Sequence, residues 1–181
     1  HQGVIALLSP IEYQNFDEVV RRVIEEGRTP LVLVLDRVSD VGNFGAICRS
    51  AECAGVDTIL IPVKGSAQIN SYAVKSSAGA IFNIPICRTG HILSEVRQLK
   101  ESGLRIVACS EKGDKTIFGS NLSGPMAVLM GSEEDGIGEG LMEIADEHLN
   151  IPMAGLTGSL NVSVATGIVL FERLRQASHV G

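Results

Sequence analysis

The chain has 181 residues, of which 45% are hydrophobic and 20% are charged. This length and composition fit one globular domain with a full-sized core, and they exclude a disordered chain, a disulfide-stabilised miniprotein and a coiled coil. The formal net charge of −6 argues weakly against a nucleic-acid partner, but the charges are uneven, since residues 60–100 carry five basic residues and one acidic residue.

Helices and apolar strands alternate along the chain. In chain order, the sequence predicts a helix over 12–26, a strand over 31–35, a helix over 44–54, a strand over 58–61, a helix over 72–78, a strand over 82–86, a helix over 91–101, strands over 105–109 and 127–130, a helix over 138–145, a strand over 149–151 and a helix over 160–176. The strands are apolar runs without period-two alternation, which indicates parallel strands buried on both faces. The pattern therefore predicts an α/β fold, in which helices flank a parallel sheet within one domain over 11–181.

Four cysteines stand at positions 48, 53, 87 and 109, and no pair forms a CxxC motif. Three of the four have apolar or small neighbours, which favours reduced thiols in the core. The four histidines do not cluster with them, so no zinc or other metal site is expected. The sequence has no run of about 18 apolar residues and no signal peptide, so we expect a cytoplasmic protein with no membrane partner.

Three polar segments that contain glycine follow predicted strands, which is where open α/β sheets bind ligands. The first runs from Asp36 to Arg49, and it places Asn43 at the start of a predicted helix and Arg49 six residues later. Helix N-terminal amides and an arginine can hold a phosphate, although a capping asparagine and a surface arginine explain the same residues. The segment has only G-x-x-G, at Gly42 and Gly45, and so lacks the Rossmann fingerprint G-x-G-x-x-G.

The second segment, residues 131–140, is rich in glycine and acidic residues and has no lysine, so it is not a P-loop. Its adjacent acids would repel the phosphates of a nucleotide and would tolerate a cation, such as a metal ion or a sulfonium. An acidic helix N-terminus, stabilised by the helix dipole, is the structural alternative.

The third segment, residues 151–163, contains Gly155 and Gly158, which let a loop turn sharply beside a ligand. Ser159 is predicted to cap the last helix, and Asn161 lies in its first turn, where its amide could reach a ligand. A simple capping loop is the alternative interpretation.

Taken together, the three segments resemble the ordered motifs of the SpoU (TrmH) family, which are RNA ribose 2′-O-methyltransferases of the SPOUT class. The matching stretches are Asn43-Phe-Gly-Ala-Ile-Cys-Arg-Ser-Ala, Leu129-Met-Gly-Ser-Glu-Glu-Asp-Gly, Ile151-Pro-Met-Ala-Gly and Ser159-Leu-Asn-Val-Ser. The resemblance extends over about 31–176. Ser66-Ala-Gln-Ile-Asn and Ser163-Val-Ala-Thr-Gly are similar to the branch that methylates a guanosine of bacterial large-subunit (23S) rRNA.

The resemblance implies a parallel α/β sheet with a deep C-terminal trefoil knot, a feature that general folding rules make very rare. It also implies a homodimer that binds S-adenosylmethionine within the knot and acts on RNA. The opening residues resemble the segment that joins the catalytic domain to a small N-terminal RNA-binding domain. Residues 1–10 are therefore expected to be the remainder of a linker from such a domain.

The resemblance also assigns expected roles to individual residues. Arg49 matches the catalytic residue, and it is expected to face the cofactor of the other subunit. The matched supporting residues are Asn43, Glu133, Ser159 and Asn161. The expected cofactor-binding residues are Gly131, Ile151 and Leu160 through their backbone, with Met153 nearby, and Cys109 and Ser110 at the junction of strand 105–109 with the loop that follows it. That loop is also expected to line the pocket.

Arg49 is described in this family as a general base, yet a guanidinium with a pKa above about 12 is a poor base. Our hypothesis is that Arg49 binds an RNA phosphate and stabilises the negative charge that develops on the ribose oxygen. The target remains open between rRNA and tRNA. A non-catalytic RNA-binding relative and a Rossmann-type nucleotide-dependent enzyme are the other functional alternatives.

Overall fold

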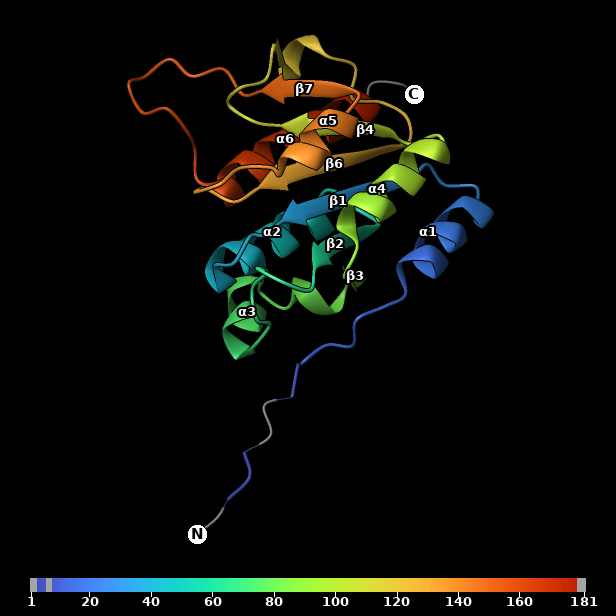
Figure 1. Ribbon diagram of the computed structural model, residues 1–181, viewed down its shortest axis with the longest axis vertical. Helices are drawn as coiled ribbons and strands as arrows, with labels where there is room; N and C mark the ends of the chain where they lie inside the picture. Colours follow the sequence, from blue (N-terminus) through green and yellow to red (C-terminus); the bar gives the residue numbers. More distant parts are fainter. Residues whose placement is uncertain (1–2, 6–7, 179–181) are drawn as a thin grey trace.

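The computed structural model describes residues 3–5 and 8–178 and shows a parallel sheet between two layers of helices (Figure 1). Its helices are α1 (Phe16–Glu25), α2 (Val41–Cys53), α3 (Ser71–Ser76), α4 (Ile92–Glu101), α5 (Glu139–Ile144) and α6 (Val162–Ser178), with short 3-10 helices η1 (Ala80–Phe82) and η2 (Ile117–Gly119). Its strands are β1 (Leu31–Asp36), β2 (Thr58–Pro62), β3 (Ile86–Thr89), β4 (Arg105–Cys109), β5 (Lys115–Thr116), β6 (Met126–Gly131) and β7 (Glu147–Asn150).

Within the described residues, the seven strands form one sheet in the order β3-β2-β1-β6-β4-β7-β5, and every pair is parallel. The interior strand β1 is buried along its whole length. Leu31, Leu33 and Leu35 face a core formed with α2, α3 and α6, whereas Val32 and Val34 face a second core formed with α1, α4 and α5. Successive side chains of a strand point to opposite faces of the sheet, so a strand that is buried on both faces needs apolar residues at every position.

The parallel arrangement places the carboxyl ends of all strands at one edge of the sheet. The strands β1, β6, β4 and β7 are consecutive neighbours, so the segments that follow them lie side by side at that edge. These segments are residues 37–40, 132–138, 110–114 and 151–161. From β1 the chain continues to β2 on one side of the sheet, whereas β6 is the neighbour of β1 on the other side. The strand order therefore changes direction at β1, and open α/β sheets bind ligands at such points.

One predicted strand is wrong. Residues 80–82 form η1, and the strand begins at Ile86 instead of Phe82. The chain turns at Ala78 and Gly79, both with positive φ, and Pro85 has no N–H to donate to a ladder. The carbonyl oxygen of Pro85 instead accepts hydrogen bonds from the backbone N–H and the hydroxyl of β2 residues.

Three predicted helix starts also need correction. Helix α1 begins at Phe16 and not at residue 12, because Asn15 caps it by accepting a hydrogen bond from the backbone N–H of Glu18. Helix α2 begins at Val41 and is capped by Asp40, whose carboxylate accepts a hydrogen bond from the backbone N–H of Asn43 at 2.7 Å. Asn43 is therefore the third residue of the helix and not its cap. The cap of α6 is Asn161, whose side-chain oxygen accepts from the backbone N–H of Ser163 at 2.9 Å, so Ser159 does not have the predicted capping role.

The remaining predictions concern the cysteines, membrane spans, the knot and the linker. All four cysteines are free thiols, and burial raises the pKa of Cys48 and of Cys109 to about 12, which keeps both protonated. None of the described helices combines the length and hydrophobicity needed to cross a bilayer. The trefoil knot stays a prediction, as does the linker over 1–10, of which residues 1, 2, 6 and 7 lie outside the described residues.

Glu172 lies in the last two turns of α6 and is 8% exposed. Hydrogen bonds from Arg175 and then Gln176 lower the pKa of the Glu172 carboxyl to about 2, below its usual 4.5. A lowered pKa in the folded state stabilises the fold above about pH 4.5, and this stabilisation is lost as the pH falls towards 2.

Replacing Glu172 by glutamine is therefore expected to lower the melting temperature at pH 7 by roughly 2–4 °C, and the deficit should shrink at pH 3. Thermal denaturation followed by circular dichroism at both pH values measures the effect. The control is Glu52→Gln on the exposed side of α2. A deficit of the same size at both pH values would show that the carboxylate charge is not responsible.

Candidate active site

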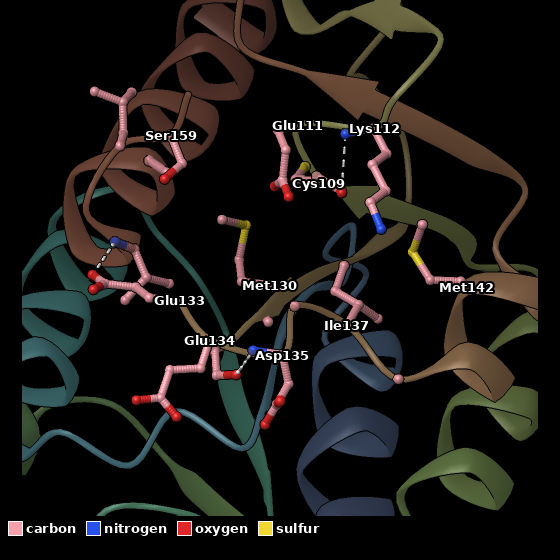
Figure 2. A pocket seen from close by; sticks show the side chains of 18 of the residues that line it. Cys109, Glu111, Lys112, Met130, Glu133, Glu134, Asp135, Ile137, Met142 and Ser159 are labelled. Carbon is pink, nitrogen blue, oxygen red and sulfur yellow. Dashed lines mark hydrogen bonds between the residues drawn. The ribbon is translucent and has the colours of Figure 1, made fainter. Parts of the chain in front are cut away.

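A cavity of about 760 Å³ opens at the carboxyl edge of the sheet, between the segments that follow β1, β6, β4 and β7 (Figure 2). Figure 1 shows the segment after β7 as a long loop that extends away from the sheet before it returns to α6. The cavity volume is in the range found for sites that bind cofactor-sized molecules. The structure thus brings the second and third polar segments of the sequence together around one pocket.

The wall of the pocket formed by residues 131–138 is folded very tightly. The backbone N–H of Gly136 donates to the carbonyl oxygen of Ser132 at 2.9 Å, and the hydroxyl of Ser132 accepts from the N–H of Asp135 at 3.0 Å. A Cβ atom on Gly131 would lie 2.1 Å from the backbone carbon of Gly136 and 2.3 Å from the nitrogen of Ile137. Only glycine fits at position 131, because the loop folds directly back onto the end of β6.

The end of β1 holds this loop in place through Asp36, which opens the first polar segment but was assigned no individual role in the sequence analysis. The carboxylate of Asp36 is 5% exposed and accepts a hydrogen bond from the backbone N–H of Gly138 at 2.6 Å. It also accepts from Nε of Arg37 at 3.1 Å. Arg37 lines the pocket and has a φ of 61°, which is unusual for a residue with a side chain. The position of both polar residues directly after a buried apolar strand was the available signal.

Asn43, Glu133 and Asn161, one from each of the three motifs, form a hydrogen-bonded cluster beside the pocket. The side-chain Nδ2 of Asn161 donates to Oδ1 of Asn43 and to Oε1 of Glu133, both at 3.0 Å. Oε1 of Glu133 also accepts from the backbone N–H of Val162 at 3.0 Å, so it satisfies a free amide at the start of α6 (Figure 2). The cluster therefore connects α2, the loop over 131–138 and α6.

Arg49 lies outside the pocket lining. It is exposed on α2, six residues and about 9 Å of helix rise beyond Asn43. In the described part of the chain, no ion pair joins its guanidinium to a carboxylate. Arg49 is therefore free to contact a ligand that approaches the surface of α2.

The six residues expected to bind the cofactor all line the pocket, and so do two of the expected supporting residues. They are Cys109, Ser110, Gly131, Ile151, Met153 and Leu160, together with Glu133 and Ser159. Some further lining residues have no individual role in the sequence analysis. They are Arg37 in the first polar segment, Glu111 and Lys112 in the loop after strand 105–109, Ile137 and Gly138 in the second segment, and Met142. Most of them stand next to a motif residue in the chain, so proximity to the motifs was the signal that could have found them.

The charged residues of the pocket favour a positively charged ligand. Five carboxylates line it against two basic side chains, and one of those, Arg37, is neutralised by Asp36; the carboxylates are Glu111, Glu133, Glu134, Asp135 and Glu139. Apolar side chains such as Met130, Ile137 and Leu160 provide the surface for an uncharged ring system. Within the described residues, no group of three or more His, Cys, Asp or Glu is placed to hold a metal ion. This chemistry fits a molecule that combines a flat heterocycle with a sulfonium centre.

Comparison with known proteins gives a consistent result. The chain is 42% identical over 179 residues to the 23S rRNA (guanosine-2′-O-)-methyltransferase RlmB of Photorhabdus laumondii. The matched region covers 98% of this chain and 72% of that protein. Its fold matches the SpoU methyltransferase AviRb of Streptomyces viridochromogenes in complex with AdoMet, with a TM-score of 0.81 and 27% identity over 93% of this chain and 67% of that one. It also matches the TrmH/SpoU tRNA modifying enzyme of A. aeolicus, with a TM-score of 0.77 and 29% identity over 90% of this chain and 84% of that one.

A family model, described as the SpoU rRNA Methylase family, matches residues 30–171. These limits include all three motifs, the whole sheet and most of α6. The agreement of motifs, fold and pocket with the family model leads to one conclusion: the chain belongs to the SpoU rRNA methylase family.

Proposed function

We propose that this chain is an S-adenosylmethionine-dependent RNA methyltransferase that acts on the ribose 2′-hydroxyl of a guanosine in bacterial 23S rRNA. The observation that carries the proposal is the meeting of two distant motifs around one pocket whose charge and size fit the cofactor, with Asn43 of the third motif hydrogen-bonded to Asn161 beside it. The names of the relatives with about 42% identity support guanosine in 23S rRNA as the target. A tRNA target is the second candidate, because one structural neighbour is a tRNA modifying enzyme.

Several residues of this chain would hold the cofactor. The tight turn at Gly131 exposes backbone to the pocket, and the ends of the long loop contribute Ile151 and Leu160. The carboxylates around the mouth favour a cationic centre, and apolar side chains favour the adenine ring. When bound, S-adenosylmethionine supplies an electrophilic methyl group on a positively charged sulfur.

The acceptor side of the reaction is assigned to the Asn43 cluster and to Arg49. The 2′-oxygen of the ribose forms a bond to the methyl carbon as the carbon–sulfur bond breaks, and the hydroxyl proton leaves to phosphate or water. The side-chain N–H groups of Asn43, whose oxygen accepts a hydrogen bond from Asn161, orient the ribose beside the pocket. Arg49 binds an adjacent RNA phosphate and stabilises the negative charge that develops on the oxygen.

A homodimer belongs to the proposal because Arg49 does not line the pocket of its own chain. A second subunit would bring its Arg49 to this pocket, so that each active site contains residues of both chains. We also propose that residues 1–10 continue into an RNA-binding domain and that the enzyme works in the cytoplasm, where its RNA substrate is found. Such a domain would supply RNA affinity that a net charge of −6 does not favour.

Methyl transfer from radiolabelled S-adenosylmethionine tests the proposal directly. The purified protein is incubated with undermodified 23S rRNA and with unmodified tRNA, and the modified nucleotide is identified by its resistance to alkaline hydrolysis. Transfer to one guanosine of 23S rRNA is the expected result. Transfer to tRNA alone would establish the second candidate, and cofactor binding without transfer to either RNA would indicate a non-catalytic relative.

A further inference from the structure

Tyr72 is an exposed aromatic side chain against the first turn of α2, the turn that carries Asn43. It stands in the first turn of α3 and is 56% exposed. A Cβ atom on Gly42 would lie 3.3 Å from Cε1 of the Tyr72 ring and 3.4 Å from its hydroxyl oxygen. One edge of the ring therefore lies against the first turn of α2, the turn that also carries Asn43, and much of the side chain faces solvent.

The ring is held by a close contact between two helices. A Cβ atom on Gly45 would lie 1.8 Å from the hydroxyl of Ser76, so α3 packs directly on the backbone of α2. Tyr72 and Ser76 are four residues apart on one side of α3, and they meet Gly42 and Gly45, which are three residues apart on α2. The carboxamide of Asn70 also accepts a hydrogen bond from the backbone N–H of Tyr72 at 2.9 Å. The ring therefore loses little conformational freedom when it binds a ligand.

The surroundings of the ring suit a polyanion. Lys75 is exposed three residues after Tyr72 on the same side of α3, and Arg49 continues the α2 stripe of Gly42 about 10 Å further along the helix. Neither cation makes an ion pair with a carboxylate of the described residues. The chain has no acidic residue from position 58 to 94. The carboxylate of nearby Asp40 is engaged in capping α2.

We propose that Tyr72 is a stacking platform for a base of the RNA substrate next to the methylated nucleotide, with Lys75 beside it to contact a phosphate. This inference rests on the proposed function. An aromatic face accepts any unstacked base, and proteins that read single-stranded RNA use such faces together with basic side chains. The catalytic cluster contacts the target ribose and no other nucleotide. Tyr72 would add affinity for the RNA strand and would fix the position of the neighbouring nucleotide.

The test compares Tyr72→Ala, Tyr72→Phe and Tyr72→Trp with wild type, and uses Phe118→Ala as the matched control. Phe118 is 55% exposed in η2, beyond the edge strand β5 at the far side of the sheet from β3. RNA affinity is measured by fluorescence anisotropy, cofactor affinity by calorimetry, and folding by thermal denaturation. Tyr72→Ala is expected to weaken RNA binding roughly tenfold to a hundredfold, with cofactor affinity unchanged. The Phe and Trp variants and the control should stay close to wild type.

A second measurement reports stacking itself. A 2-aminopurine placed beside the target nucleotide should be quenched by wild type and by Tyr72→Trp, and less by Tyr72→Ala. The inference is overturned if Tyr72→Ala binds RNA as tightly as wild type, if Tyr72→Phe loses as much affinity as Tyr72→Ala, or if Tyr72→Ala changes the oligomeric state. Wild-type protein that binds no RNA would also overturn it. Failure of the proposed function is seen separately, as wild-type protein that transfers no methyl group.

Discussion

Replacing Gly131 by alanine is expected to weaken S-adenosylmethionine binding at least a hundredfold while the sheet still folds. The added Cβ atom would lie 2.1 and 2.3 Å from backbone atoms of Gly136 and Ile137, and no real Cβ contact is that short. Backbone cannot move aside as a flexible side chain can, so the loop over 131–138 must shift away from the end of β6. Overpacking of this kind costs about 3 kcal/mol. If it destabilises only the loop conformation that binds the cofactor, this cost corresponds to a loss of about a hundredfold in affinity.

Calorimetric titration with S-adenosylmethionine measures the effect, and thermal denaturation shows whether the fold survives. Gly90→Ala is the matched control, because no atom lies within 4 Å of a Cβ built at position 90 and the backbone there has no positive φ. The control should bind the cofactor like wild type. Unchanged affinity in Gly131→Ala would mean that this loop does not form the cofactor site.

The parts of the fold that could be predicted are those governed by local pattern. Strand 105–109 was located to the residue, and the run 31–35 became a strand buried on both faces, because a central parallel strand requires apolar residues at every position. The strand predicted over 82–86 failed because hydrophobicity alone does not distinguish a buried 3-10 turn from a strand. The two-residue strand β5 has no such pattern, since its pairing with β7 depends on tertiary structure.

The part of the site that could be predicted is the part that the motif residues themselves form. The hydrogen bonds that assemble it join residues far apart in the chain: 118 residues separate Asn43 from Asn161, and 102 separate Asp36 from Gly138. No local pattern encodes such a pairing, which explains why Asp36 was assigned no individual role. Asn161 was expected in the first turn of α6, but its capping of that helix and its bonds to two other motifs depend on the packing of α2 against α6.

Replacing Arg49 by alanine is expected to lower kcat about a thousandfold and to leave S-adenosylmethionine affinity unchanged. The guanidinium lies outside the pocket lining, so the cofactor loses no contact. In the proposed mechanism the side chain stabilises charge that exists only in the transition state, and removal of such a donor costs about 3–4 kcal/mol. Single-turnover methylation of 23S rRNA measures the rate, and calorimetry measures cofactor affinity. A weakened cofactor affinity with an unchanged single-turnover rate would contradict this role.

Arg49→Lys distinguishes the possible roles of the side chain. A lysine keeps the positive charge but cannot bind a phosphate through two parallel N–H groups, so bidentate anchoring predicts a loss of more than tenfold. A role as a point charge predicts a rate close to that of wild type. A role as a general base predicts that the lysine variant gains activity at high pH, because an ammonium loses its proton at about pH 10 and a guanidinium above about pH 12.

A mixture of the Arg49→Ala and Gly131→Ala proteins tests whether the arginine acts across a dimer. If Arg49 of one subunit serves the pocket of the other, a mixed dimer contains one complete site, formed by the intact pocket of the first variant and the intact arginine of the second. Random exchange of subunits then restores about a quarter of wild-type activity. If Arg49 serves the pocket of its own chain, neither site of the mixed dimer is complete and no activity returns. Recovery therefore requires both a dimer and a shared active site, whereas a monomeric enzyme gives no recovery at any mixing ratio.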